Sequence, residues 1–154
     1  MKRTETPEAQ LETFLARYTP EISALAKAAV VKMRKLLPGA AELVYGNYNA
    51  LVIGFAPGER PSHALFSIAL YPRWVNLFFL HGKSLQDPHK LLKGSGNQVR
   101  SIVLESAGML DDPAVRDLIA EAVERSAVPF DGTQKRKMII RAIAAKQRPR
   151  RPAK

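Results

Sequence analysis

Apolar residues recur at helical spacing through the first part of the chain and predict two helices there. Each helix is preceded by a threonine and a proline, Thr6-Pro7 and Thr19-Pro20. These pairs supply an N-cap hydroxyl and a first helical residue whose missing N–H removes no helix hydrogen bond. The apolar stripe covers residues 11–18 in the first helix and 22–37 in the second, up to Pro38-Gly39. Such a period is typical of helices that bury one face.

Beyond Pro38-Gly39 the pattern changes from helical to alternating, which is typical of strands with two unlike faces. We expect strands at residues 42–45, 48–55, 64–70, 74–80 and 99–104, with turns at Gly46-Asn47 and at residues 71–74. The strand at 74–80 carries apolar side chains on both faces. Because a half-solvated sheet shows cleaner alternation, we expect a helix, a second subunit or a ligand to cover its second face.

The C-terminal third begins with a well-marked helix and ends in less regular sequence. Asp112-Pro113 caps an apolar stripe over residues 115–123. Residues 138–145 fit either a helix or an edge strand, and we favour a strand because β-branched residues alternate there with Arg141. Prolines then interrupt residues 147–152, which predicts an extended, solvated arm.

Together these elements predict an α+β fold, with an antiparallel β-sheet of about five to six strands and with N-terminal helices and a C-terminal helix packed on it. We place a single domain at residues 1–145 and a basic, proline-containing arm at 146–154. The absence of cysteine excludes disulfides and thiolate chemistry. We expect no signal peptide in residues 1–7, because a carboxylate and a proline come before any apolar run, and no apolar stretch reaches the roughly 20 residues that cross a bilayer. We therefore expect a cytoplasmic protein without membrane insertion.

Positive charge is concentrated at the C-terminal end. The chain has 24 Lys or Arg and 14 Asp or Glu, for a net charge of +10. Residues 135–154 hold nine of the basic residues and none of the acidic ones, so the other 15 basic residues nearly balance the 14 acidic ones. Such an end attracts polyanions because bound phosphates release counterions. We consider non-specific nucleic-acid contact through Lys146, Arg148, Arg150 and Arg151, with an anionic membrane surface and a merely solubilising terminus as alternatives.

The segment between the fourth and fifth strands holds the most unusual residue types. Asp87-Pro88 predicts one short helical turn, which Leu91-Leu92 would anchor to the core. In Gly94-Ser95-Gly96 the missing Cβ atoms allow successive backbone N–H groups to point at one anion, with Lys93 and Arg100 adding charge. The alternative is that Gly94 ends the helical turn and Gly96 forms a turn of its own.

Three segments of this region and its surroundings resemble a known family. They are Leu85-x-Asp87-Pro88-x-x-Leu91-Leu92-Lys93-Gly94-x-Gly96-x-x-Val99-Arg100, Tyr45-Gly46-Asn47-Tyr48-Asn49-Ala50-Leu51 and Val75-Asn76-Leu77-Phe78-Phe79. Over about residues 10–127 the chain resembles the YdhG-like domain-of-unknown-function family, also described as frataxin-like. The resemblance implies an α+β fold with helices at both chain ends and no established catalytic residue, and some relatives are proposed to deliver iron. The usual lysine after the second glycine is Asn97 here.

Chemistry-bearing residues form no catalytic or metal-binding motif in the sequence. The three histidines are scattered, and no Ser, His and acid have motif spacing. We expect no enzyme activity, no metal site and no cofactor. An iron-handling surface of frataxin type would need clustered carboxylates, for which the candidates are Glu5, Glu8, Glu12, Glu59, Asp111 and Asp112. The alternative role of these residues is to complement helix dipoles and to keep the surface soluble.

The aromatic residues Tyr71, Trp74 and Phe78 either line a ligand site, form a dimer contact or belong to the core under a helix. We expect a non-enzymatic binding or adaptor domain whose recognition surface combines the sheet face with the Asp87–Arg100 loop. The candidate residues are Tyr45, Trp74, Phe78, Lys93, Gly94, Ser95, Gly96 and Arg100. The expected partner is a small anion or a protein, and a homodimer is a further option. A nucleic-acid accessory protein and a frataxin-like iron chaperone are the alternative functions.

Overall fold

The computed structural model describes residues 5–153, and within them lie three α-helices, six strands and three short 3₁₀ helices. In chain order these are α1 (Pro7–Leu15), α2 (Pro20–Leu36), β1 (Ala41–Gly46), β2 (Leu51–Ala56), η1 (Pro61–His63), β3 (Phe66–Leu70), β4 (Val75–Phe79), η2 (Gly82–Ser84), β5 (Arg100–Leu104), η3 (Ala107–Asp111), α3 (Pro113–Glu124) and β6 (Lys137–Ile143). Residues 1–4 and Lys154 lie outside the described residues. The first four belong to the segment in which we expect no signal peptide, and Lys154 is the last residue of the expected arm.

The helices begin where their capping residues predict. Thr6 Oγ1 accepts a hydrogen bond from the Ala9 N–H at 3.1 Å, and Thr19 Oγ1 accepts one from the Ile22 N–H at 3.4 Å. Asp112 caps α3 in the same way. Each side-chain oxygen satisfies one backbone donor that the first helical turn leaves without a partner. The predicted helix starts are therefore confirmed.

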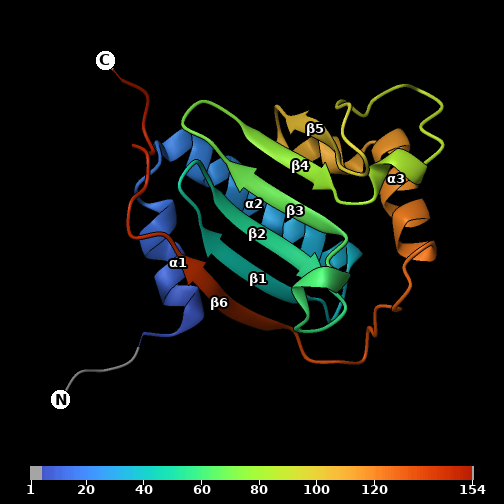
Figure 1. The fold of residues 1–154 in the computed structure, drawn as a ribbon, viewed down its shortest axis with the longest axis horizontal. Helices are drawn as coiled ribbons and strands as arrows, with labels where there is room; N and C mark the ends of the chain where they lie inside the picture. Colours follow the sequence, from blue (N-terminus) through green and yellow to red (C-terminus); the bar gives the residue numbers. More distant parts are fainter. Residues whose placement is uncertain (1–4, 154) are drawn as a thin grey trace.

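The strands form one sheet with the order β5-β4-β3-β2-β1-β6. From β1 to β5 each strand pairs antiparallel with the next, but β6 lies parallel to β1. The α+β class and the strand at the end of the chain are confirmed, whereas the expectation of a wholly antiparallel sheet is wrong at this edge. Residues 125–136 bring the chain back from α3 along one side of the sheet, so that β6 enters it from the same end as β1 (Figure 1).

The hydrophobic core lies between the sheet and α2, which crosses behind the strands in Figure 1. Phe55, Phe66 and Phe79 are fully buried on this side, and the rings of Phe66 and Phe79 meet edge-to-face with centroids 5.5 Å apart. Burying a side chain of this size contributes about 1.5–3 kcal/mol to folding. The predicted alternation is confirmed, since every second residue of β3 and β4 faces this core: Phe66, Ile68, Leu70, Val75, Leu77 and Phe79.

Tyr18 ties the loop between α1 and α2 to the central strands. Its buried hydroxyl donates to the carbonyl oxygen of Leu70 at 2.9 Å and accepts from the N–H of Leu51 at 3.0 Å. Burial raises the pKa of the Tyr18 phenol, while the hydrogen bond from Leu51 acts in the opposite direction. The phenol therefore provides hydrogen-bond partners for two backbone groups that are buried away from water.

A buried carboxylate holds α2 to the sheet. The side chain of Glu42 on β1 is 1% exposed, and it accepts hydrogen bonds from Arg34 Nε at 2.8 Å and Arg34 Nη2 at 2.9 Å. Arg136, just before β6, adds a third contact at 3.4 Å. The hydrogen bond to Glu42 raises the pKa of the Arg34 guanidinium. One carboxylate thus links α2, β1 and the segment that leads into β6.

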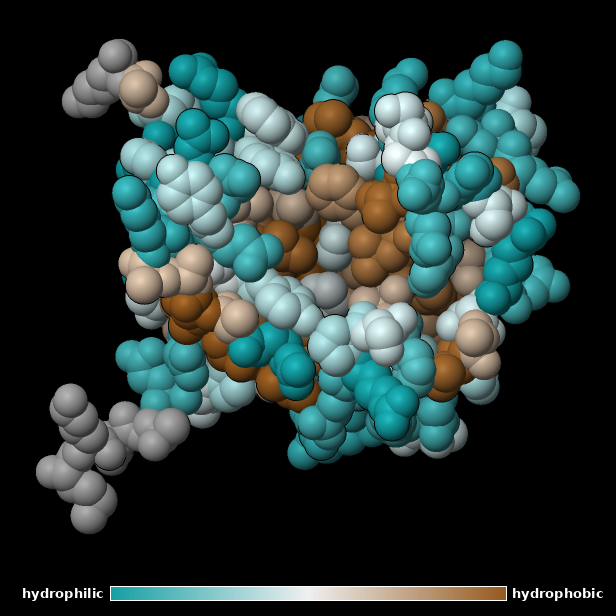
Figure 2. All heavy atoms as spheres, viewed as in Figure 1, coloured by the Kyte–Doolittle hydropathy of each residue, from teal (hydrophilic) through white to brown (hydrophobic). Residues whose placement is uncertain are grey.

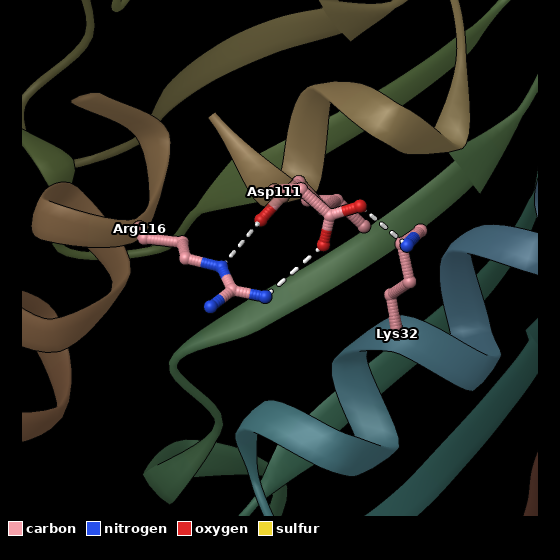
Figure 3. Close-up of polar contacts among 4 residues, drawn as sticks. Lys32, Asp111 and Arg116 are labelled. Atoms are coloured by element: carbon pink, nitrogen blue, oxygen red, sulfur yellow. Dashed lines mark hydrogen bonds and ion pairs between the residues drawn. The ribbon is translucent and has the colours of Figure 1, made fainter. Parts of the chain in front are cut away.

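A second ion cluster joins α2 to α3 through η3 (Figure 3). Asp111 accepts from Lys32 Nζ at 2.5 Å and from Arg116 Nη2 at 3.0 Å, and Arg116 Nε donates to the carbonyl oxygen of Leu110 at 3.4 Å. Lys32 and then Arg116 hold the pKa of the Asp111 carboxyl below its usual range. The cluster is exposed to solvent, so its contribution to stability is small.

Gly39 fixes the path of the segment that returns to β6. Its φ of 80° lies in the left-handed region, and a Cβ at this position would collide with the backbone oxygen of Asp131 and lie 2.8 Å from that of Gln134. The Gln134 side chain donates to the carbonyl oxygens of Gly39 at 2.7 Å and Pro57 at 3.0 Å. Only glycine allows this close approach, which positions the start of β6.

Candidate functional site

The face of the sheet that points away from α2 is organised in two rows of side chains. One row consists of Lys93, Ser101, Phe78, Ser67, Gly54, Leu43 and Ile139, and the other of Val103, Asn76, Ala69, Val52, Tyr45 and Ala142. Paired residues on neighbouring strands point to the same face of a sheet. We call these two rows the open sheet face, because within residues 5–153 no α-helix lies over them (Figure 1). At one end Leu43 belongs to a buried cluster with Ala64, which follows η1.

The middle of the open sheet face is lined by small residues. Gly54 on β2 and Ser67 and Ala69 on β3 are buried, with Ser67 7% and Ala69 1% exposed. Larger side chains stand on either side of them, Tyr45 on β1 and Phe78 on β4. With strands about 4.8 Å apart, the floor between these aromatic rings is two strands wide. Figure 2 shows apolar residues gathered at the centre of this face, with hydrophilic residues around them.

A polar group without a partner lies in this apolar surface. Asn76 Oδ1 is buried and accepts no hydrogen bond from any described residue. Its neighbours on the adjacent strands are Ala69 and Val103, whose side chains have no donor. A buried acceptor without a donor costs about 1–3 kcal/mol. Asn76 Oδ1 is therefore an acceptor whose hydrogen-bonding capacity the described residues leave unused.

Aromatic residues continue the face beyond the strand ends. Tyr71 and Trp74, in the turn between β3 and β4, stack with ring centroids 4.9 Å apart and an interplanar angle of 18°. Trp74 is 43% exposed. Of the three interpretations of these aromatics, core packing under a helix is wrong for Trp74. Tyr45 on β1 and Phe78 on β4 lie on one face of the sheet, and Trp74 lies in the turn that leads into β4.

The loop before β5 contributes less to this face than the sequence suggested. Asp87-Pro88 forms a turn and not a short helix, because the Asp87 carboxylate accepts from the N–H groups of Leu91 at 2.8 Å and Leu92 at 2.9 Å. Arg100 Nη1 donates to the carbonyl oxygens of Gly96 and Val99, both at 2.8 Å. This guanidinium supports the loop, which leaves it poorly placed to bind an anion.

Among the loop candidates, Lys93 belongs to the open sheet face. Its backbone pairs with that of Ser101, with N···O distances of 2.8 and 2.9 Å, so its side chain joins the row that contains Phe78. Gly94 has a φ of 125°, a backbone conformation that favours glycine, so this residue needs no ligand to explain its presence. Gly94, Ser95 and Gly96 are exposed beyond the edge of the sheet.

The C-terminal segment is bound to the rest of the molecule, so the expected solvated arm is not observed. Arg150 is 7% exposed and donates to the carbonyl oxygen of Asn47 at 2.7 Å and to Gln147 Oε1 at 3.0 Å. Arg151 donates to the carbonyl oxygens of Ala16 and Arg17. Contacts between guanidinium and carbonyl groups have no signature in the sequence, which explains why the pattern of prolines and arginines was misleading.

Three of the four predicted nucleic-acid residues, Lys146, Arg148 and Arg151, remain at the surface of this docked segment, and Arg150 is buried. Lys146 and Arg148 are exposed, and the Arg148 guanidinium lies 5.9 Å from the ring centroid of Tyr48, which is itself 47% exposed. Within residues 5–153, the ion pairs of the basic end involve Arg136 and Lys137. The exposed cations after β6 that the structure describes have no carboxylate partner, so they form a positive surface.

The described residues do not bring candidate metal ligands together. Within residues 5–153, no group of three or more His, Asp or Glu side chains is placed to hold a metal ion. Glu12 pairs with Lys27 at 2.9 Å, and Asp111 belongs to the cluster in Figure 3.

Sequence reasoning did not select Asn76 and Ser67 as site residues. The signal was present, since each is a single polar residue within an apolar strand segment, in Val75-Asn76-Leu77 and Phe66-Ser67-Ile68. Within the described part of the chain, no helix is both long and apolar enough to cross a membrane. In comparisons with protein-family models, curated proteins and solved structures, nothing matches this chain.

Proposed function

We propose that the protein is a non-catalytic binding domain that accepts a small, flat, largely apolar molecule on its open sheet face. The observation that carries this proposal is the buried Asn76 Oδ1 without a donor. A ligand that lies on the small residues of β2 and β3 would bring an N–H or O–H group to this oxygen. Lys93 at the end of one row adds a cation for a ligand that also carries negative charge.

The shape of the face favours a planar ligand over a bulky one. Gly54, Ser67 and Ala69 form a floor of small residues together with the larger Val52, and the rings of Tyr45 and Phe78 stand on its two sides. Aromatic side chains contribute large apolar contact areas and prefer offset-stacked or edge-to-face arrangements with other rings. A bicyclic aromatic molecule spans about two strand spacings.

The test compares two ligands of the same shape on two proteins. Indole carries an N–H donor and benzothiophene does not. We expect the wild-type protein to bind indole about tenfold more tightly than benzothiophene, which corresponds to about 1.4 kcal/mol for one hydrogen bond. In the Asn76→Leu variant this preference is expected to disappear, because the acceptor is gone. Isothermal titration calorimetry measures the four dissociation constants.

The controls separate loss of binding from loss of structure. Asn76→Leu removes an unsatisfied buried acceptor, so its melting temperature is expected to match or exceed that of the wild type. Tyr48→Ala, at an exposed position away from the face, is expected to leave both affinities unchanged. An indole preference that survives Asn76→Leu contradicts the proposal, and so does a dimer that covers this face and binds neither molecule.

The YdhG-like, frataxin-like relationship is part of the same proposal. Two helices at the start of the chain, an antiparallel run from β1 to β5 and a helix after it support this relationship. The parallel strand β6 is an addition that the resemblance did not imply. Iron delivery has no supporting contact among the described residues, and we do not propose it.

Nucleic-acid contact is a second candidate function, supported by the surface of the docked C-terminal segment. Lys146 and Arg148 are exposed and unpaired with any described carboxylate, and Tyr48 next to Arg148 offers a ring face for a base. Single-stranded nucleic acid is bound by such combinations of cations and exposed aromatic rings. The docked geometry would give this surface a fixed shape.

Point substitutions test this function better than truncation does. Removing the segment would also remove Arg150 and Gln147, which bind carbonyl groups of the turn between β1 and β2. The test is the double substitution Lys146→Gln and Arg148→Gln, with binding to oligo-dT measured at several salt concentrations. The slope of log K, the association constant, against log salt concentration is expected to become less steep by about 1.4, which is about 0.7 for each lost phosphate contact. The matched control replaces the exposed Lys35 and Lys90 with Gln. If the control weakens binding equally, only net charge matters and the proposed surface is wrong.

A further inference from the structure

A cavity lies on the other side of the sheet from the open sheet face, between η1, η2 and the C-terminal end of α3. Its volume is about 320 Å³, which is within the range of small-ligand sites. Its apolar wall includes Leu65, Phe79 and Leu85, all of which belong to the buried core. The cavity therefore opens from the surface into the main hydrophobic core.

The ionisable residues that line this cavity are all bases. They are His63, His81 and Arg125, and no carboxylate lines it. Ser62, Ser84 and Ser126 add hydroxyl groups nearby. An apolar wall with donors and a cation at its mouth is complementary to a molecule with a hydrocarbon body and one anionic end.

The Arg125 side chain forms an ion pair with a carboxylate outside the lining. Glu121 Oε2 lies 2.9 Å from Arg125 Nε, and Glu121 Oε1 accepts from the N–H of Gln86 at 3.2 Å. These contacts hold α3 to the segment after η2. The two Nη atoms of Arg125 make no hydrogen bond with any described residue. Within residues 5–153 Glu121 Oε2 accepts no hydrogen bond, so its contact with Arg125 is an ion pair without a directed N–H···O bond. The planar guanidinium presents its donors as a fork that fits a carboxylate.

His81 is held in one orientation. Its Nδ1 lies 2.9 Å from Gln98 Oε1, and an amide oxygen can only accept, so Nδ1 carries the hydrogen. Nε2 is left for a ligand or for water. Together, Arg125 and His81 place polar groups at the mouth of the cavity without closing its apolar wall.

We propose that this cavity binds a small monocarboxylate with an apolar tail. The carboxylate pairs with Arg125 at the mouth, and the tail lies against Leu65, Phe79 and Leu85. This site shares no residue with the open sheet face, so it constitutes a second binding site of different chemistry.

Hexanoate and 1-hexanol are the probes, because they have the same tail and differ in charge. We expect the full-length protein to bind hexanoate at least tenfold more tightly than 1-hexanol. Arg125→Gln is expected to lower the affinity for hexanoate at least tenfold, because the carboxylate loses its partner. The affinity for 1-hexanol is expected to stay within twofold of the wild-type value. Arg116→Gln, on the same helix and with the same loss of charge, is the matched control and is expected to change neither affinity. Titrations followed by ¹⁵N chemical shifts give the affinities and the location.

A second variant addresses the apolar wall. Ala122→Leu adds volume at a lining position of α3 and is expected to lower the affinity for both probes at least fivefold. Its ¹⁵N spectrum, which should be that of a folded protein, is the control for loss of structure. Hexanoate is expected to shift the amide signals of Ala122 and Val128 and to leave those of Gly54 and Ala69 unchanged. The proposal is overturned if hexanoate does not bind, if Arg125→Gln changes its affinity less than twofold, or if the two probes bind equally.

Discussion

Replacing Glu42 with alanine is expected to lower the free energy of unfolding by about 2–4 kcal/mol. Breaking a fully buried ion pair by removing one partner costs about 3–5 kcal/mol. The expected loss is somewhat smaller here, because the Arg34 side chain is 30% exposed and regains some hydration. The carboxylate itself is 1% exposed and binds two nitrogens of Arg34, so no water can replace it without rearrangement.

Chemical denaturation measures this loss, with Glu59→Ala as the matched control. Glu59 is a carboxylate 60% exposed that pairs with Lys137 at 2.9 Å, next to the Arg136 that contacts Glu42. Exposed pairs contribute about 0–1 kcal/mol. We expect the Glu42 variant to lose at least twice as much stability as the Glu59 variant. Equal losses would show that the buried position of Glu42 has no special role.

Tyr18→Phe is expected to lower the free energy of unfolding by about 2–3 kcal/mol. The substitution keeps the ring and removes the hydroxyl, so the carbonyl of Leu70 and the N–H of Leu51 lose their partner inside the core. A buried group without a partner costs about 1–3 kcal/mol. Tyr48→Phe, at a 47% exposed position, is expected to change stability by less than about 0.5 kcal/mol.

The same residue gives a pH dependence with a definite sign. Burial raises the pKa of the Tyr18 phenol in the folded protein above its ordinary value of 10.0. The folded state therefore binds the phenolic proton more tightly than the unfolded state does. This contribution is fully present below pH 10 and is lost as the pH rises through the folded pKa. Between pH 8 and pH 11, the difference in stability between wild type and Tyr18→Phe should shrink. A constant or growing difference would contradict the assignment.

Local signals in the sequence predicted the helices and the faces of the strands. Thr-Pro pairs fix helix starts by local hydrogen bonds, and alternation fixes which side chains share a face, so both are encoded within a few residues. Pairing partners are not encoded in this way. The parallel position of β6 depends on the return path of residues 125–136 and on the close approach at Gly39, which only the folded chain reveals.

The candidate site was predicted in part, for similar reasons. Alternation placed Trp74 and Phe78 on the second face, and the structure brings Tyr45 to the same face through the pairing of β1 with β2. Arg100 and Arg150 were misread, because each donates to backbone carbonyls that no sequence pattern marks. Asn76 gains its significance from neighbours on other strands, Ala69 and Val103, which leave its oxygen without a donor.

A ¹⁵N chemical-shift titration with indole is the most direct test of the open sheet face as the recognition surface. The result that we expect is saturable movement of the Asn76 side-chain amide signal, together with the backbone signals of Ser67 and Ala69. Signals from α2 residues such as Met33, on the opposite side of the sheet, should stay in place. Indole that leaves the Asn76 signal unmoved at saturation, or that moves only signals outside the two rows, would contradict the account.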